Sequence, residues 1–156
     1  MEELIRKAKE KGIDVEDLLI QLIYSDDPEG EVKFRLEMAK KYMAEAEDYL
    51  KKGDPVQASE KAYKVAEEVV KALAEKFNLP EHQKAKSEGR WYTHLLVSAS
   101  SKLSQKVGDW VLSGWDAGYS LHVWGFHEAV DDVIPRVEKV RKMLEESEKL
   151  LTGSAP

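Results

Sequence analysis

The sequence predicts an all-α protein, an antiparallel up-and-down helical bundle of about five long helices preceded by a short N-terminal helix. Three observations predict this class. Apolar residues recur every three or four positions over long stretches, which is the period of an amphipathic helix. No stretch alternates Val, Ile or Thr with polar residues in the way a strand does. Gly, Pro and Asn residues divide the chain into segments of helical length.

The first segments form a clear helical hairpin. A short amphipathic helix is expected at 14–24 and a long one at 31–52. The apolar seam of the long helix consists of Leu36, Ala39, Met43, Ala46 and Leu50. Gly53 ends this helix, Asp54 is placed to cap the next one, and Pro55 occupies its first position. The second helix is expected at 55–77, and so short a joint makes the two helices antiparallel.

Three further helices are expected at 90–107, 109–129 and 132–151. The segment 80–90, with His82, Lys84, Lys86 and Arg90, reads as a mildly basic connector closing over the core. The length of 156 residues fits one domain over 1–151, with a frayed tail at 152–156. The hairpin faintly resembles a tetratricopeptide unit, but no second copy follows at the period that a solenoid needs.

Composition excludes several classes of function. The chain has no cysteine, which rules out disulfides, thiolate metal sites and cysteine nucleophiles. Its net charge of −6 opposes non-specific binding to nucleic acid. The Glu- and Lys-rich composition suits a thermophile, although many mesophilic helical proteins share it. We expect a cytoplasmic protein, since the N-terminus has no apolar signal core and no stretch is long and apolar enough for a membrane span.

Composition changes sharply over residues 89–130. This stretch holds all four tryptophans and three of the four histidines, but only six charged residues. On a helical wheel of 109–130, one face is aromatic and is formed by Val111, Trp115, Tyr119, His122 and Phe126. The opposite apolar face consists of Trp110, Gly114, Ala117, Leu121 and Trp124. A helix that is apolar on two sides is buried, so the second face is expected to meet another subunit; the alternative is the central helix of a monomer.

The candidate catalytic residues are Arg90, His94, Asp116 and His127. Arg90 and His94 are four residues apart near the start of an expected helix, so their side chains share one face. A guanidinium can hold a phosphate while a nearby imidazole moves a proton. Asp116 and His127 share a polar stripe, where the carboxylate could orient the imidazole. The alternative is that none of these residues is catalytic: Arg90 only begins a helix, His94 fills a position at the edge of the core, and His127 is an ordinary surface histidine.

A metal site is not expected. His122 is read as a histidine packed inside the bundle, and it lies on a different side of the helix from His127. The two histidines therefore cannot grip one ion as those of zinc proteases do. The sequence also lacks a phosphate loop, a dinucleotide fingerprint and a nucleophile elbow, and no cofactor is expected.

Several stretches together resemble the archaeal PaREP family, which is placed in or near the HEPN superfamily. They are residues 44–54, residues 57–64, the turn Gly89-Arg90-Trp91, and the distinctive tryptophan–histidine segment 121–128. The resemblance covers about residues 31 to 150 and implies a helical bundle that often dimerises. Some HEPN domains bind nucleotides beside a nucleotidyltransferase partner, and others are metal-independent ribonucleases that use an Arg and a His. In ribonucleases of this kind, four to six residues stand between the Arg and the His, whereas only three separate Arg90 from His94. No Arg stands at the required distance before His122 or His127.

The sequence favours a non-catalytic or nucleotide-associated module that acts as a homodimer or with a nucleotidyltransferase-type partner. The first alternative is a divergent, metal-independent HEPN ribonuclease working on RNA through Arg90, His94 and His127. The second is a purely structural interaction module.

Overall fold

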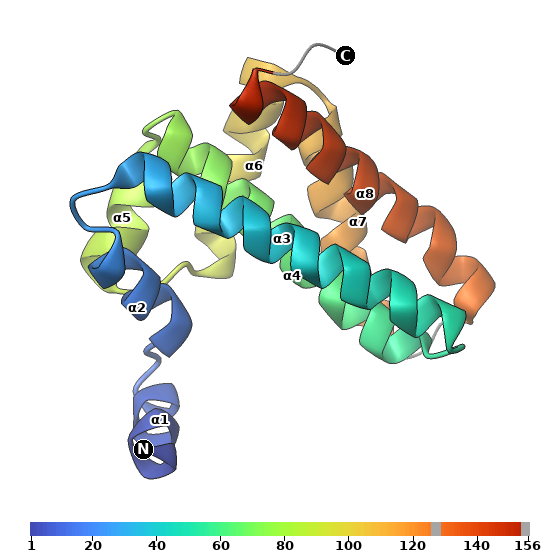
Figure 1. The fold of residues 1–156 in the computed structure, drawn as a ribbon, viewed down its shortest axis with the longest axis horizontal. Coiled ribbons are helices and arrows are strands. Elements are labelled where there is room, and N and C mark those ends of the chain that lie inside the picture. Colours follow the sequence, from blue (N-terminus) through green and yellow to red (C-terminus); the bar gives the residue numbers. More distant parts are fainter. Residues whose placement is uncertain (126–128, 154–156) are drawn as a thin grey trace.

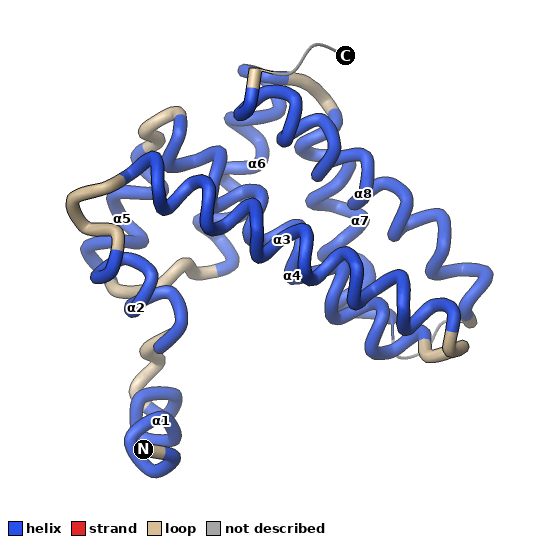
Figure 2. Tube along the Cα trace, viewed as in Figure 1, coloured by secondary structure: helices blue, strands red, loops and turns tan. Residues whose placement is uncertain are grey.

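The computed structural model describes residues 1–125 and 129–153, and within them it contains eight α-helices and no β-strand (Figure 2). The helices are α1 (Glu2–Glu10), α2 (Val15–Ile23), α3 (Pro28–Lys51), α4 (Pro55–Lys76), α5 (Pro80–Glu88), α6 (Thr93–Val107), α7 (Trp110–Trp124) and α8 (Val130–Thr152). The predicted all-α class is therefore confirmed. Most of the tail expected at 152–156 lies outside the described residues.

Two of these helices, α1 and α5, go beyond those that the sequence predicts, so the predicted helix count is wrong. α1 is mostly charged, with acidic residues in its first turn and basic ones in its last, an order that favours a helix. α5 has Pro80 at its first position and ends at Gly89, which adopts a left-handed conformation with φ of 73°. The expected basic connector is thus a helix, and it buries Glu81, His82 and Ala85.

The hairpin of α3 and α4 runs through the middle of the molecule, and other helices pack around it (Figure 1). The side chain of Asp27 accepts a hydrogen bond from the backbone N–H of Gly30 at 2.9 Å, which caps α3. Asp54 accepts from the backbone N–H of Gln57 at 3.1 Å, which caps α4. Gly53, with φ of 74°, ends α3 between them. The predicted stop and cap of this hairpin are confirmed, although α3 begins three residues earlier than expected.

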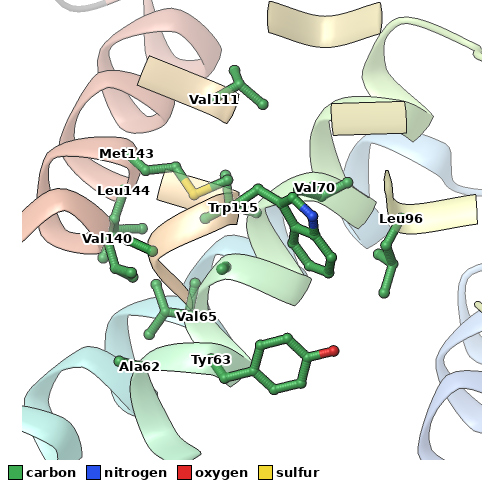
Figure 3. Packing of buried hydrophobic residues seen from close by; sticks show 14 of the residues in the cluster. Ala62, Tyr63, Val65, Val70, Leu96, Val111, Trp115, Val140, Met143 and Leu144 are labelled. Carbon is green, nitrogen blue, oxygen red and sulfur yellow. The ribbon is translucent and has the colours of Figure 1, made fainter. Parts of the chain in front are cut away.

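α7 packs against both α4 and α8 (Figure 3). A Cβ on Gly118 would lie 2.7 Å from Cβ of Ala66 in α4, and one on Gly114 would lie 2.5 Å from Cβ of Met143 in α8. Both glycines therefore permit a close approach within the chain. Within one chain α7 is thus closely packed on two sides, and a contact of this helix with another subunit stays a prediction.

The face of α7 that was expected to meet another subunit is largely covered by the chain itself. Gly114, Ala117 and Leu121 are buried in the core. Trp110 is half-buried, and Trp124 at the other end is 59% exposed. α8 packs against the middle of this face. Among the five residues of the face, only Trp110 and Trp124 at its ends could therefore contact another subunit.

The expected aromatic face of α7 is buried only in its first half. Val111 and Trp115 belong to the core, whereas Tyr119 is 38% exposed and His122 is also exposed. Phe126 lies outside the described residues. The prediction of a continuous buried aromatic face is wrong, because the side of α7 that carries Tyr119 and His122 faces solvent while Leu121 on another side stays buried.

α1 projects away from the rest of the molecule at the N-terminal end (Figure 1). None of its residues is buried, and its contacts with α2 are few. Among the described residues, no helix combines the length and apolar character needed to cross a membrane.

Candidate functional site

Arg90 and His94 come together through Tyr92 rather than along one helix. α6 begins at Thr93, so Arg90 lies in the loop before it and the expected shared helical face does not exist. The Arg90 guanidinium lies 5.0 Å from the centroid of the Tyr92 ring, and Tyr92 stacks on His94 with ring centroids 5.8 Å apart. Arg90 Nη1 also donates a hydrogen bond to the carbonyl oxygen of Gly12 at 3.3 Å. The result is an exposed Arg90–Tyr92–His94 stack beside the α1–α2 loop.

The other two candidate catalytic residues are not brought into this stack by anything the structure describes. Asp116 is exposed on α7. His127 lies outside the described residues, so its expected partnership with Asp116 stays a prediction.

His122 is not packed inside the bundle as expected. Its ring stacks on Tyr63 of α4 with centroids 4.2 Å apart, and its Nδ1 lies 3.3 Å from Oε1 of Glu60. The side chain is nearly half exposed. His122 therefore closes the outer edge of the α4–α7 contact, where the core gives way to solvent.

A buried charge network of Asp17, Glu31, Arg35, Glu68 and Lys71 joins α2, α3 and α4. Arg35, which is 1% exposed, donates to Asp17 at 3.0 Å, to Glu31 at 3.1 Å and to Glu68 at 2.9 Å. Lys71 donates to Asp17 at 3.0 Å and to Glu68 at 3.3 Å. Buried charges are tolerated only when they are paired in this way.

The network holds Asp17 and Lys71 in their charged forms. Burial alone would raise the pKa of Asp17, but the cations of Lys71 and Arg35 hold that pKa below its usual value. Burial would likewise lower the pKa of Lys71, but Glu68 and Asp17 raise it above its usual value. Both residues are therefore ionised at neutral pH.

The network forms no sequence motif, because most of its members are far apart in the sequence. One local signal was available: Lys71 interrupts the otherwise apolar run from Val69 to Ala74, and that run fills every side of its helix. A lone charge in such a run must be buried, and therefore must have partners. The sequence does not say which residues those partners are.

A polar pocket of about 310 Å³ lies beside the network, where the ends of α2 and α4 meet the start of α3 and the helix α5. It is lined by Gln21, Tyr24, Ser25, Pro28, Glu31, Glu75, Asn78, His82, Gln83 and Lys86. Burial, followed by the charge of Glu31, raises the pKa of Glu75 to about 8. Burial lowers the pKa of His82, whose Nε2 lies 3.5 Å from a Glu75 oxygen. The pocket thus pairs a weakly acidic carboxyl group with a neutral imidazole.

An apolar groove of about 560 Å³ runs between α2 and α3. It is lined by Glu16, Leu19, Ile20, Ile23, Tyr24, Phe34, Glu37, Met38, Lys41 and Tyr42. Several of these apolar side chains are well exposed, including Ile23 at 72%. The groove is therefore an exposed, mostly apolar surface formed by α2 and α3.

The described residues contain no group of three or more His, Asp or Glu side chains arranged to hold a metal ion. In the polar pocket, two carboxyl groups are accompanied by one neutral histidine and a lysine.

Comparison with known proteins identifies relatives for most of the chain. Residues 34–151 match the archaeal PaREP1/PaREP8 family, which confirms the resemblance seen in the sequence. A crystal structure of a Sulfolobus solfataricus protein has 38% identity and a TM-score of 0.66, covering 73% of this chain and 96% of that one. A solution structure of the same structural-genomics target has 37% identity and a TM-score of 0.65, covering 76% and 94%. No curated protein matches significantly.

Proposed function

The chain belongs to the archaeal PaREP1/PaREP8 family, and from that premise we propose that it is a HEPN-like, non-catalytic interaction module that forms a homodimer. The observation that carries this proposal is the unpartnered apolar surface of α1 and α2. The α1 helix of each copy is proposed to occupy the apolar groove of the other.

The shape of α1 supports this assignment. On a helical wheel, Met1, Leu4, Ile5 and Ala8 share one face. None of these residues is buried in its own chain, and Leu4 is 65% exposed. An amphipathic helix this short is marginal in water unless its apolar face is packed. A partner for that face is therefore expected.

The groove complements α1 in length and charge. One wall of the groove is α2, which has nine residues, and α1 also has nine. Lys7 and Lys9 flank the apolar face of α1 on its two sides, and the groove is lined by two carboxylates, Glu16 and Glu37, and one cation, Lys41. A second copy supplies both surfaces reciprocally, as a two-fold symmetric dimer requires.

The test is the mass in solution, measured by light scattering on variants of both surfaces. Leu4→Glu on α1 and Ile23→Glu in the groove should each convert the dimer to monomer, because each buries a charge in the contact. Arg6→Gln, on the polar face of α1, should leave the dimer intact. A wild-type protein that is a strict monomer at high micromolar concentration would overturn the proposal.

Mixing the two monomeric variants separates this arrangement from other dimers. The Leu4→Glu chain keeps an intact groove, and the Ile23→Glu chain keeps an intact α1, so the mixture can form one complete α1–groove contact. A heterodimer should therefore appear only in the mixture. If α1 contacted α1 instead, mixing would restore nothing.

The Arg90–Tyr92–His94 stack supports a second candidate function, the binding of a nucleotide or single-stranded RNA. Exposed aromatic rings beside a guanidinium form a platform on which a base can stack while the cation meets the phosphate. Both rings and the guanidinium are accessible in this chain.

Chemical-shift titration with AMP and with a short RNA in EDTA tests this candidate. Arg90→Ala and Tyr92→Ala should each weaken binding, whereas Lys84→Ala, on the exposed side of α5, should not. Unchanged spectra for the wild-type protein would exclude the platform. EDTA-resistant RNA cleavage that disappears in Arg90→Ala would instead establish the ribonuclease alternative.

A further inference from the structure

A third pocket, of about 580 Å³, lies where the first turns of α3 meet the ends of α4 and α8 (Figure 1). Its volume falls within the range of roughly 300–1,000 Å³ that is typical of small-molecule sites. We call it the amphipathic pocket, because its lining combines an apolar part with two cations. The residues that define it are Val32, Leu36 and Leu151 on the apolar part and Lys33 and Lys76 on the polar part.

The apolar part of this pocket is continuous with the hydrophobic core. Val32 is 8% exposed and Leu36 is 6% exposed, so both form a nearly closed floor. Leu36 belongs to the core, and Leu151 packs against the core from the last turn of α8. An apolar group that enters the pocket therefore leaves water for contact with core side chains, which is favourable.

The two cations come from different helices and have no carboxylate partner. Lys33 is in the second turn of α3, Lys76 ends α4, and both side chains are exposed. Neither forms an ion pair with a residue that the structure describes. By contrast, Lys40, Lys52 and Lys61 each lie within 4 Å of a carboxylate. In a chain of net charge −6, the amphipathic pocket thus gathers two uncompensated ammonium groups.

The carboxyl groups of the lining leave one positive charge in excess. Glu29 contributes one negative charge at the start of α3. Glu75 is mostly protonated at pH 7, because burial and the charge of Glu31 raise its pKa to about 8, and its side chain bonds to Glu31. With two lysines and one carboxylate, the lining matches a ligand that carries a single negative charge.

We propose that the amphipathic pocket binds a small organic monoanion with an apolar body, of the class of medium-chain carboxylates. The carboxylate lies between Lys33 and Lys76, which donate charge-assisted hydrogen bonds to it. The apolar chain contacts Val32, Leu36 and Leu151. The lining contains no aromatic ring on which a nucleotide base could stack, so this site differs from the platform beside α6.

Isothermal titration with octanoate tests the proposal. Saturable binding with a dissociation constant of about 1 mM or tighter is expected. In the series butyrate, hexanoate, octanoate, each added methylene should strengthen binding about two- to fourfold. Octylammonium has the same chain and the opposite charge, and it should bind about tenfold more weakly or worse. Absence of octanoate binding, or equal binding of octylammonium, would overturn the proposal.

Methyl chemical shifts determine which site octanoate enters. The methyl groups of Val32, Leu36 and Leu151 should shift on binding. Those of Leu19 and Ile23, in the apolar groove, should not. Saturable shifts confined to the apolar groove would contradict the assignment.

Substitution of the two lysines tests the polar part of the site. Lys33→Gln and Lys76→Gln should each weaken octanoate binding several-fold, and the double variant should no longer prefer octanoate to octylammonium. The matched control is Lys142→Gln, since Lys142 is an exposed lysine of α8 that has no ion pair and does not line the pocket. A double variant that binds octanoate as tightly as the wild-type protein would overturn the proposal. Circular dichroism confirms that each variant is folded.

The amphipathic pocket is independent of the proposed homodimer, because no residue of α1 or α2 lines it. Leu4→Glu should therefore bind octanoate with wild-type affinity, whether or not the wild-type protein is a dimer. Loss of octanoate binding in Leu4→Glu would place the ligand at the contact between α1 and the apolar groove, and would overturn the assignment to the amphipathic pocket.

Discussion

Arg35 contacts three carboxylates, from Asp17, Glu31 and Glu68, and Lys71 shares two of them. The network therefore has three negative groups and two positive ones. Removing a carboxylate leaves two charges of each sign, whereas removing Arg35 leaves three carboxylates facing one ammonium. The two changes should differ in cost, because an uncompensated buried charge is the larger penalty.

Arg35→Met is expected to lower the free energy of unfolding by about 3–5 kcal/mol, as the loss of one partner of a buried ion pair does. Asp17→Asn should cost less, about 1–3 kcal/mol, since it removes hydrogen-bond acceptance but restores the charge balance. Asp48→Asn, which removes an exposed pair with Lys52, should cost less than about 1 kcal/mol. Urea denaturation measures all three, and an equal cost for Arg35→Met and Asp17→Asn would contradict the charge-balance argument.

The contribution of Asp17 should also depend on pH in a definite direction. Its pKa in the folded protein is below the usual value, so the unfolded chain takes up a proton first as pH falls. The stabilisation is therefore complete above the usual aspartate pKa and is lost as pH falls towards the lowered value. The difference in stability between the wild-type protein and Asp17→Asn should shrink in the same window.

At the scale of the helices, α7 depends on having no side chain at two positions. Gly118 brings α7 against Ala66 of α4, and Gly114 brings it against Met143 of α8. A glycine inside a helix costs stability relative to alanine. Here the close packing of three helices offsets that cost.

Gly118→Ala is expected to lower stability by about 1–3 kcal/mol through overpacking against α4. This loss should outweigh the gain of roughly 1 kcal/mol that alanine brings to a helix interior. Adding Ala66→Gly removes the atom in conflict, so a double-mutant cycle in thermal denaturation should show a favourable coupling between the two changes. The matched control is Ser113→Ala on the exposed side of α7, which should be neutral. A stabilising Gly118→Ala would mean that α7 and α4 lie further apart.

Helices could be predicted from the sequence where local chemistry decides them. The α3–α4 hairpin follows from Gly53, Asp54 and Pro55, whose effects act within one turn of helix. The partner of α7 could not be predicted in the same way. Its two apolar faces require burial, but a helical wheel does not say whether the covering helix belongs to the same chain.

At the scale of the whole molecule, the charge network and the polar pocket could not be predicted from the sequence, because both depend on how the helices are arranged in the fold. Asp17 and Lys71 are separated by 54 positions, and the pocket takes side chains from four helices. The candidate pair Arg90 and His94 does meet, but through the ring of Tyr92, since the helix starts after Arg90 rather than at it.

The position of α2 has an evolutionary consequence. The family match covers residues 34–151, so Arg35, Glu68 and Lys71 lie within the matched segment, here called the core, while Asp17 and Glu31 precede it in what is here called the N-terminal extension. The core alone contributes two cations and one carboxylate to this site, and the N-terminal extension adds two carboxylates. The extension therefore reverses the sign of the site's net charge. Lineages that gain or lose it should show compensating substitutions at positions 35 and 71, so that the extension and the two cations are inherited together.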